Sequence, residues 1–325
     1  MTGVLLVNKT IGLIGYRNHA SRIRTILETE FKDVKIKKIF HPTKKFSDGI
    51  NTNNFEELYD CDCIFILSPN ETHFEYIMKL IENYEGYIFC EKPVVTESSE
   101  FNIINKLDKK TKQRIFFNFN LRYGKMNDIL KKEVSKMGDI SYVNIISSHG
   151  LAFKEEYINS WRADGSKNRN NILDTLAIHY LDLILFHIPD IRVSNYLPYL
   201  ISKNGTSFDT CLLVLSTEKL SFSIYCSYAN PMINEVMVIG TKGYLTIRDE
   251  KQEIFSPRDT FDENGFFKKP PMSNNKKFNF EEEYKESLKN SVKFFMNHMI
   301  ENTPIDENIF EKSMQTTRFL IDLKS

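Results

Sequence analysis

Short apolar runs alternate with amphipathic stretches through the first 120 residues of the chain. The apolar runs are rich in β-branched and aromatic side chains, and they predict strands at residues 9–15, 34–40, 61–67, 87–90 and 114–119. The stretches between them have helical spacing, which predicts helices at residues 19–31, 71–83 and 98–107. This alternation is typical of parallel strands joined by helical crossovers, so we expect a parallel sheet covered on both faces.

The pattern changes after residue 121, where longer alternating segments predict a second sheet. A helix at 126–135, a strand at 141–148 and a helix at 173–187 come before strands at residues 192–201, 208–216, 221–228 and 235–248. A polar stretch at 255–277 is predicted to be a surface loop, and helices follow at 281–301 and 307–323. We therefore predict an α/β protein with two domains. Residues 1–121 form a doubly wound parallel sheet, and residues 122–325 form an α/β domain with a large, mostly antiparallel open sheet.

Length and charge agree with two globular domains that act on a small molecule. The chain has 325 residues, of which 41% are hydrophobic, and 43 basic side chains balance 43 acidic ones. A balanced charge provides no field that would attract nucleic acid or anionic lipid. The five cysteines fall within or beside predicted strands and suit reduced core thiols without a metal site. Because no apolar run is long enough for a signal peptide or a membrane span, we expect a soluble cytoplasmic protein.

The first predicted strand runs into a turn where dinucleotide-binding folds hold the pyrophosphate. Gly15 matches the first glycine of the fingerprint, Arg17 replaces the second, and Ala20 replaces the third, which tolerates alanine. The turn also contains Tyr16 and Asn18, and it leads into a helix N-terminus that favours phosphate. We predict a Rossmann-type cofactor site here, with an ordinary strand-to-helix turn as the alternative.

The chain lacks, after the second predicted strand, the carboxylate that would hold both hydroxyls of an adenosine ribose. It reads Phe40-His41-Pro42-Thr43-Lys44-Lys45. Without a carboxylate there is no repulsion against a 2′-phosphate, and Lys44, Lys45 and Arg17 are suited to pair with one. NADP is therefore favoured over NAD, and we predict that His41 and Lys44 bind the cofactor. The alternative is an ordinary solvated turn.

Six segments, in order along the chain, resemble the Gfo/Idh/MocA family of glucose-fructose oxidoreductase and inositol dehydrogenase relatives. They are residues 15–20, 68–73 (Ser-Pro-Asn-Glu-Thr-His), 91–93 (Glu-Lys-Pro), 119–123 (Phe-Asn-Leu-Arg-Tyr), 177–182 and 238–243. The resemblance implies a Rossmann domain joined to an α/β domain, with the active site in the crevice between them. It also implies a homodimer or homotetramer assembled through the open sheet of the second domain.

The resemblance places the nicotinamide end of the cofactor beside Lys92. It implies that Lys92 hydrogen-bonds the reacting hydroxyl, and that Asn70 and Glu91 contact the nicotinamide ribose. These residues follow predicted strands, at the sheet edge where doubly wound folds bind ligands. For Lys92 the alternative is an exposed loop lysine. The cofactor-binding residues predicted after these strands are Ser68, Pro69, Asn70, His73, Glu91 and Lys92.

His179, on the predicted helix at 173–187, is implied by the resemblance to be the acid/base. A structural helical histidine is the alternative. Many relatives have an acid four residues earlier, where this chain has Thr175, which can hydrogen-bond substrate but carries no charge. Asp174 stands one position further back. On a regular helix a separation of five turns Asp174 away from His179, so we expect Asp174 to cap or stabilise the helix start.

The loop at residues 164–171 carries basic and amide side chains where relatives often have glycines. These groups suit sugar hydroxyls or a phosphate, which favours a nucleotide-linked sugar as substrate, with a solvated loop as the alternative. Trp161 and Arg162 are suited to stack against a ligand and to clamp a carboxylate or phosphate, although a core tryptophan with a surface arginine fits nearly as well. The predicted substrate-binding residues are Arg122, Tyr123, Trp161, Arg162, Thr175 and His179.

A lysine and a histidine beside a nicotinamide can orient a hydroxyl and take its proton while the adjacent carbon gives up hydride. The sequence therefore predicts an NAD(P)-dependent sugar dehydrogenase or ketoreductase with Lys92 and His179 as catalytic residues. One alternative is a redox-inert dinucleotide- or sugar-binding relative, motivated by Arg17 and Thr175. Another is a lyase or glycosidase that uses the nicotinamide transiently.

Overall fold

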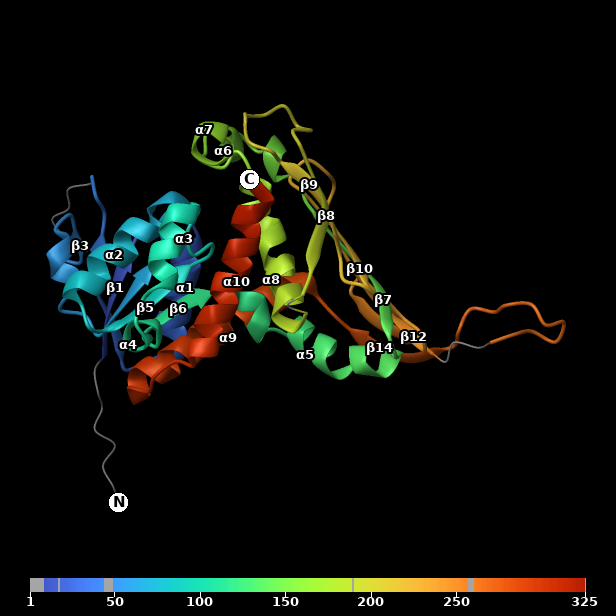
Figure 1. The fold of residues 1–325 in the computed structure, drawn as a ribbon. Coiled ribbons are helices and arrows are strands. Elements are labelled where there is room, and N and C mark those ends of the chain that lie inside the picture. The colour runs from blue at the N-terminus through green and yellow to red at the C-terminus, as the bar shows by residue number, and fades with distance from the viewer. Residues whose placement is uncertain (1–8, 17, 44–48, 189, 257–259, 325) are drawn as a thin grey trace, which may run out of the picture. The chain divides into compact units, whose positions relative to one another are not determined.

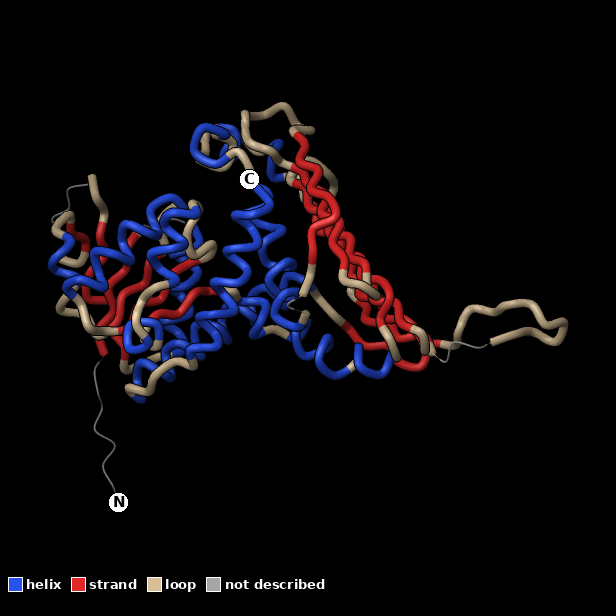
Figure 2. Tube along the Cα trace, viewed as in Figure 1, coloured by secondary structure: helices blue, strands red, loops and turns tan. Residues whose placement is uncertain are grey.

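The computed structural model describes residues 9–16, 18–43, 49–188, 190–256 and 260–324 (Figure 1). The chain divides into two compact units. The first consists of Met1–Asn120 and Leu288–Ile321, and the second of Leu121–Ser287 and Asp322–Ser325. Each unit contains one of the two sheets, whose strands are red in Figure 2.

The first unit is built on a six-stranded parallel sheet in the order β3-β2-β1-β4-β5-β6, the doubly wound order of dinucleotide-binding folds. The prediction of a Rossmann sheet is thus confirmed, with β3 as an addition that its two polar residues did not signal. The strands are β1 (Lys9–Ile14), β2 (Val34–Phe40), β3 (Asn51–Thr52), β4 (Cys63–Ile66), β5 (Tyr87–Glu91) and β6 (Ile115–Asn118). The helices between them are α1 (Asn18–Glu30), α2 (His73–Asn83), α3 (Ser98–Asn105) and α4 (Lys109–Lys112).

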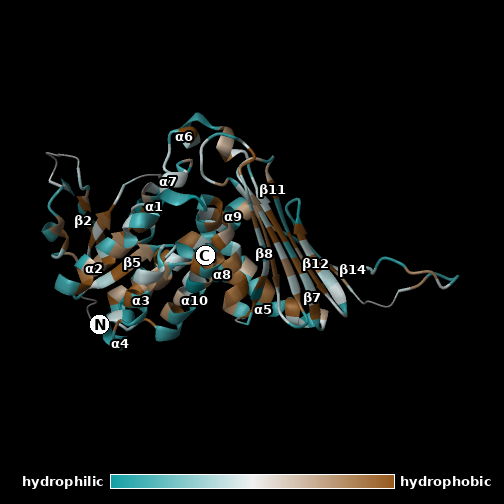
Figure 3. Ribbon diagram, turned by 45° about the horizontal axis from the view of Figure 1, so that its top comes forward, coloured by the Kyte–Doolittle hydropathy of each residue, from teal (hydrophilic) through white to brown (hydrophobic). Residues whose placement is uncertain are grey.

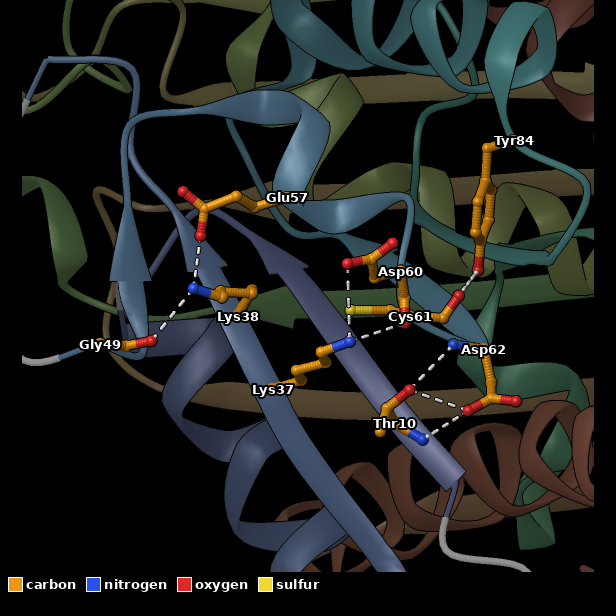
Figure 4. Close-up of polar contacts among 9 residues, drawn as sticks. All are labelled: Thr10, Lys37, Lys38, Gly49, Glu57, Asp60, Cys61, Asp62 and Tyr84. Atoms are coloured by element: carbon orange, nitrogen blue, oxygen red, sulfur yellow. Dashed lines mark hydrogen bonds and ion pairs between the residues drawn. The ribbon is translucent and has the colours of Figure 1, made fainter.

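A polar network ties the start of β1 to the loop before β4 (Figure 4). The carboxylate of Asp62 accepts hydrogen bonds from the backbone N–H and the hydroxyl of Thr10, both at 2.8 Å. Nearby, the hydroxyl of Tyr84 donates to the carbonyl of Cys61 at 2.9 Å. Because these contacts fix β1 against its neighbours, they also fix where the turn after β1 leaves the sheet.

Two helices from late in the chain contribute to the first unit, namely α9 (Phe280–Glu301) and α10 (Glu307–Lys324). Phe295 of α9 is fully buried, and its ring centroid lies 5.3 Å from that of Phe65 in β4. The predicted boundary after residue 121 assigned both helices to the second domain, whereas Leu288–Ile321 packs with the first unit. The amphipathic pattern predicts that these segments are helical, but it does not say which sheet they cover.

The second unit is built on an eight-stranded sheet in the order β14-β13-β12-β11-β7-β10-β9-β8. Among its described strand pairs, β10 and β7 run parallel and the others run antiparallel, as predicted. Its strands are β7 (Ile140–Ser148), β8 (Arg192–Tyr199), β9 (Thr210–Ser216), β10 (Ser221–Ser227), β11 (Ile233–Gly240), β12 (Gly243–Arg248), β13 (Lys251–Phe255) and β14 (Met272–Lys277). Its helices include α5 (Lys125–Lys132), α6 (Glu155–Ile158), α7 (Gly165–Asn168) and α8 (Ile178–His187).

Two expectations for this sheet were wrong. The segment 235–248, predicted as one strand, is the hairpin of β11 and β12, with Thr241 and Lys242 between the strands. The segment 255–277, predicted as a loop, contains β14, which pairs antiparallel with β13. Apolar alternation runs through both strands of the hairpin and conceals its turn. The polar residues of β14 form an edge strand because β13 offers them a hydrogen-bonding partner.

The large sheet has one buried face and one half-exposed face. In β9, Cys211 and Leu213 are fully buried, whereas Leu212 and Val214 are only partly covered. Figure 3 shows apolar residues along α8 and along the strands of this sheet. Within the described part of the chain, we find no helix with the length and apolar character needed to cross a membrane.

Candidate functional site

The turn after β1 packs closely against the chain that follows β4. Gly15 has a φ of +89°, a conformation that favours glycine. A Cβ at this position would lie only 3.0 Å from the carbonyl oxygen of Leu67, which follows β4. α1 begins at Asn18, so the turn leads directly to a helix N-terminus of the kind that holds phosphate. The packing of the turn therefore requires glycine at position 15, and the pyrophosphate site stays a prediction.

The predicted adenosine end of the site is described only in part. Arg17 and Lys44 lie outside the described residues, as does the side chain of Asn18. His41 follows β2 and is half-buried, and Tyr16 is 40% exposed. The preference for a 2′-phosphate therefore remains a prediction from the sequence.

A buried histidine supports the loop after β4. His73, at the start of α2, is fully buried, with Nδ1 2.7 Å from the carbonyl oxygen of Pro93 and Nε2 3.1 Å from that of Ser68. One imidazole therefore ties the loop after β4 to the loop after β5, while burial lowers the pKa of His73. Ser68, Pro69 and Asn70 are half-buried. The amide nitrogen of Asn70 is buried without a hydrogen-bond partner among the described residues, which leaves a donor for a ligand.

Glu91 ends β5 as a buried carboxylate that is fixed in place. Its Oε1 lies 2.8 Å from Nε2 of His19 and accepts a hydrogen bond from the amide of Asn118 at 2.6 Å. Asn118 in turn accepts a hydrogen bond from the hydroxyl of Ser291 at 2.7 Å. Burial acts to raise the pKa of Glu91, but the charges of His19 and Lys92 and the two hydrogen bonds lower this pKa to about 2. The carboxylate is therefore ionised at neutral pH.

Lys92 follows this carboxylate directly and is half-buried. The loop lies at the carboxyl end of the parallel sheet, the edge at which doubly wound folds bind ligands. The sequence motif predicted the positions of Glu91 and Lys92 but not the partners of Glu91. Asn118 ends β6, so inspection of every strand end would have found it. The sequence carries no comparable signal for His19, which lies in the first turn of α1.

The helix that carries His179 begins with a π turn at Leu173–Ala177, and α8 continues from its end. In a π turn the backbone hydrogen bonds reach five residues back, so residues five apart come to nearly the same side. The expectation that a separation of five turns Asp174 away from His179 assumed a regular helix, which the π turn interrupts between these two residues. Asp174 also lies inside the turn and does not form its N-cap.

Asp174 is 1% exposed and forms a buried ion pair. The ammonium of Lys324, at the end of α10, lies 2.6 Å from Oδ1 and 2.7 Å from Oδ2. The side-chain amide of Asn168, in α7, donates to Oδ2 at 2.9 Å. A lysine and an amide thus compensate this carboxylate inside the second unit.

Thr175 and His179 are half-buried, in contrast to Asp174. The Thr175 hydroxyl donates to the carbonyl of Asn171 at 2.5 Å and lies 2.7 Å from the hydroxyl of Tyr228. Because threonine has one hydroxyl hydrogen, Tyr228 is the donor in this second contact. Burial raises the pKa of Tyr228 to about 12, so it keeps its proton at neutral pH. The sequence analysis did not identify Tyr228.

Asn171 is a second residue that the sequence analysis missed. It is fully buried, and neither atom of its side-chain amide has a hydrogen-bond partner among the described residues. A buried amide of this kind is a candidate ligand contact, because leaving it unbonded is costly. It was considered only as part of the polar loop 164–171, where polarity alone does not separate a buried amide from a solvated one.

The remaining predicted substrate residues fall into two groups. Arg122 is buried in a bidentate pair with Asp182 of α8, with Nε 2.8 Å from Oδ2, so the structure gives it a partner inside the fold and not an open position. Tyr123 is half-buried, and burial raises its pKa. Trp161 and Arg162 are both half-buried, with the guanidinium 4.6 Å from the centroid of the tryptophan ring. The guanidinium of Arg162 thus lies against the ring that the sequence analysis assigned to stacking a ligand.

Comparison with known proteins identifies the region that contains Gly15, Glu91 and Lys92. Residues 9–119 match the Gfo/Idh/MocA family model, described as an oxidoreductase family with an NAD-binding Rossmann fold. This region belongs to the Gfo/Idh/MocA family. The resemblance predicted from the segments at residues 15–20, 68–73 and 91–93 is thereby confirmed.

Two curated Gfo/Idh/MocA-like dehydrogenases are similar to part of the chain. Glucose-6-phosphate 3-dehydrogenase of Bacillus subtilis is 27% identical over 189 residues, which are 55% of this chain and 53% of that protein. Inositol 2-dehydrogenase of Rhizobium meliloti is 23% identical over 208 residues, which are 60% of each protein. The matched stretches therefore span little more than half the length of either relative.

Similarity in fold to solved structures extends over nearly the whole chain. An oxidoreductase from Agrobacterium radiobacter, solved in complex with NAD+, L-tartaric acid and magnesium, superposes with a TM-score of 0.76 at 14% identity. The superposition covers 96% of this chain and 94% of the other. At this identity the match establishes a shared fold.

The residues of the Gfo/Idh/MocA region fit a nicotinamide dinucleotide. Glycine at position 15 keeps the turn after β1 tight beside the strand end, where dinucleotide-binding folds hold the pyrophosphate. The unpartnered amide nitrogen of Asn70 and the ionised Glu91 would hold the nicotinamide ribose. Lys92, next to Glu91, would lie nearest the chemistry. The described residues of this region are therefore compatible with a bound nicotinamide dinucleotide.

Proposed function

We propose that this protein is an NAD(P)-dependent dehydrogenase or ketoreductase that transfers hydride between a nicotinamide and a carbinol or keto carbon of a sugar. The observation that carries the proposal is the ionised, buried Glu91 followed by half-buried Lys92 in the matched family region. The names of the two curated relatives support it, since one is a dehydrogenase of a sugar phosphate and the other of inositol.

The proposed mechanism assigns the proton to the protein's own side chains. A bound nicotinamide would supply the acceptor for the hydride of the carbinol carbon, or the hydride donor in the reverse direction. The ammonium of Lys92 donates a hydrogen bond to the substrate oxygen and stabilises the negative charge that develops there. The imidazole of His179 takes the hydroxyl proton, so that the C–H and O–H bonds break as the C=O bond forms. Glu91 contacts the nicotinamide ribose and keeps Lys92 beside a fixed negative charge.

Thr175 and Tyr228 are assigned to substrate positioning. Their hydroxyls already contact each other, and Tyr228 keeps its proton at neutral pH, so the pair offers a neutral hydrogen-bonding surface for sugar hydroxyls. Such a pair fixes orientation without competing with His179 for the transferred proton. We propose that the fully buried amide of Asn171, four residues before Thr175, also contacts substrate.

We further propose a nucleotide-linked sugar as substrate and NADP as the preferred cofactor. The stacked Trp161 and Arg162 suit a flat base or a phosphate, and the loop 164–171 adds cationic and amide groups. The cofactor preference rests on Lys44 and Lys45, and on the missing carboxylate after β2.

The decisive experiment is a turnover assay with NADP+ and with NAD+ on a panel of nucleotide-linked sugars, glucose 6-phosphate and free inositols. We expect cofactor reduction with at least one nucleotide-linked sugar and a higher kcat/KM with NADP+. Lys92→Ala and His179→Ala should each lower kcat/KM by about 10²- to 10⁴-fold, because each removes a group that acts on the reacting hydroxyl. Lys285→Ala, which removes an exposed lysine of α9, is the matched control and should retain activity.

Other outcomes of these assays would support a different function or a different site. Full activity in both variants would overturn the site assignment. Cofactor binding without turnover across the panel would support a redox-inert sensor, and product formed without net cofactor reduction would support a lyase or glycosidase. Turnover confined to glucose 6-phosphate or to an inositol would overturn the nucleotide-linked substrate while leaving the dehydrogenase proposal intact.

A further inference from the structure

A π turn precedes the proposed acid/base, and it must be held in place by its surroundings. π turns are rare, and they occur mainly as single turns inserted into α-helices. An α-helix is the favoured alternative for the same residues, so a π turn persists where neighbouring groups fix it. The turn Leu173–Ala177 ends two residues before His179, so any return to α-helical geometry would rotate His179 relative to the residues before the turn.

Two adjacent side chains of the turn are anchored to other elements. Thr175 bonds back to the carbonyl of Asn171 and contacts Tyr228, which follows β10. Asp174 is bound by Asn168 from α7 and by Lys324 from α10. The lysine contact is the strongest of these anchors on electrostatic grounds, because both carboxylate oxygens lie within 2.7 Å of the ammonium and the carboxylate is 1% exposed.

A second buried ion pair lies on the other side of His179. Asp182, three residues further along the helix, is held by Arg122, with side-chain exposures of 1% and 3%. The segment with His179 is thus bounded by two buried carboxylates, each paired with a cation from a different part of the chain. The Arg122 pair fixes α8 after the histidine, and the Lys324 pair fixes the π turn before it.

We propose that Lys324 is a positioning residue for His179. By binding both oxygens of Asp174 it holds the π turn, and the turn sets the direction in which Thr175 and His179 point. This inference rests on the assignment of His179 under the proposed function. The end of α10 would thus influence the site through Lys324, although Lys324 itself contacts neither the reacting atoms nor a cofactor.

Removing Lys324 would take away the ammonium that is paired with the buried Asp174 carboxylate. A buried charge that loses its partner either draws in water or moves toward solvent, and both would disturb the turn. Arginine restores the charge and can bind both carboxylate oxygens. The double variant Asp174→Asn/Lys324→Gln replaces the ion pair with two amides. It leaves no buried charge without its counter-ion, but it also removes the ion pair that holds the π turn.

The test compares Lys324→Gln, Lys324→Arg and a control that breaks an ion pair of equal length at the surface. The control is Lys285→Gln, because Lys285 lies 2.6 Å from Glu281 with both side chains about two-thirds exposed or more. Three quantities are measured at a temperature where each variant is folded by circular dichroism. They are the turnover number kcat, the Kd for NADH, and hydrogen exchange of the backbone amides in residues 171–180.

For Lys324→Gln we expect faster exchange in residues 171–180 and a fall in kcat of about tenfold or more, with the Kd for NADH unchanged. Lys324→Arg should restore both quantities, and Lys285→Gln should leave them as in the wild type. The double variant Asp174→Asn/Lys324→Gln should also lose kcat and protection. It serves as the test if the single variant does not fold.

Two results would overturn the inference. One is exchange and kcat within about twofold of the wild type in Lys324→Gln. The other is a loss of kcat accompanied by a weaker Kd for NADH and faster exchange throughout the chain, which would make Lys324 a general stabiliser. If the wild type turns over no substrate, the proposed function fails, and the exchange data alone decide whether Lys324 holds the turn. Faster exchange confined to residues 171–180 supports that role, and unchanged exchange contradicts it.

Discussion

Glu91 keeps its charge inside the protein because its donors are supplied by distant parts of the chain. His19 comes from α1 and Asn118 from the end of β6, and both reach the same carboxylate oxygen. Burial alone would neutralise the group, yet the pKa lies at about 2. The residue is therefore both a fixed charge beside Lys92 and a source of stability that depends on pH.

The variant Glu91→Gln should change how the free energy of unfolding depends on pH. The folded pKa of about 2 lies below the ordinary value of 4.5, so the charge contributes fully above about pH 4.5 and its contribution disappears as the pH falls toward 2. We expect the variant to unfold more easily than the wild type at pH 7, by on the order of 3 kcal/mol. Denaturant unfolding of both proteins between pH 7 and pH 3 measures this difference.

The difference between the two proteins should shrink steadily below about pH 4.5. Glu301→Gln, at an exposed position of α9, is the control and should show no comparable loss at pH 7. A gap between Glu91→Gln and the wild type that stays constant down to pH 3 would contradict the ionised state assigned to Glu91.

At the scale of single residues, the sequence predicted the groups that stand next to one another in a motif. Glu91 and Lys92 were found in this way, and so were His179 and Thr175. The partners that define their chemistry were not found, since His19, Asn118 and Tyr228 reach them from other elements. A single amino-acid sequence contains no signal for such long-range pairs.

α9 illustrates how a single helix can determine the stability of a unit far from it in sequence. Its residue Phe295 is fully buried against β4 and β5, with ring centroids 5.3 Å and 5.4 Å from those of Phe65 and Phe89. The adjacent Phe294 is only half-buried. The pair therefore offers a matched comparison of burial within one helix.

Phe295→Ala should lower the free energy of unfolding by about 3–5 kcal/mol, because it leaves a cavity against the parallel sheet. Phe294→Ala should cost clearly less, because part of that ring already contacts solvent. Urea unfolding followed by circular dichroism measures both. Equal losses in the two variants would contradict the burial assigned to Phe295.

At the scale of elements, periodicity predicted where strands and helices occur better than it predicted how they connect or end. The strand at Val34–Phe40 was predicted with its observed bounds, and the helices at 281–301 and 307–323 were predicted to within one residue. The β11–β12 turn was missed because the apolar alternation continues on both sides of it. The π turn was missed because one inserted residue barely changes a helical apolar pattern over so short a segment.

At the scale of the whole molecule, the half-exposed face of the large sheet suggests an assembly. Leu212 and Val214 in β9 are only partly covered within one chain, and Phe266 and Phe267, between β13 and β14, are 70% and 89% exposed. Apolar surface of this kind is typical of an interface. We propose a homodimer or homotetramer formed through this sheet.

Light scattering coupled to size exclusion tests the assembly. The wild type should have the mass of two or four chains at micromolar concentration, and Leu212→Lys/Val214→Lys should shift it toward one chain, because the added charges would have to be buried. Glu301→Lys is a charge-changing control elsewhere on the surface and should leave the mass unchanged. A wild type with the mass of a single chain would contradict the proposal.

The contribution of Leu288–Ile321 to the first unit affects the order in which the protein can fold as it is synthesised. When a ribosome has translated residue 287, all strands of both sheets have been made, but Phe295 has not. The apolar side of the parallel sheet that receives this ring therefore stays uncovered while residues Leu121–Ser287 are translated. The first unit is complete only once Leu288–Ile321 have been made, and its exposed aromatic side chains are the surface that a chaperone would meet during that interval.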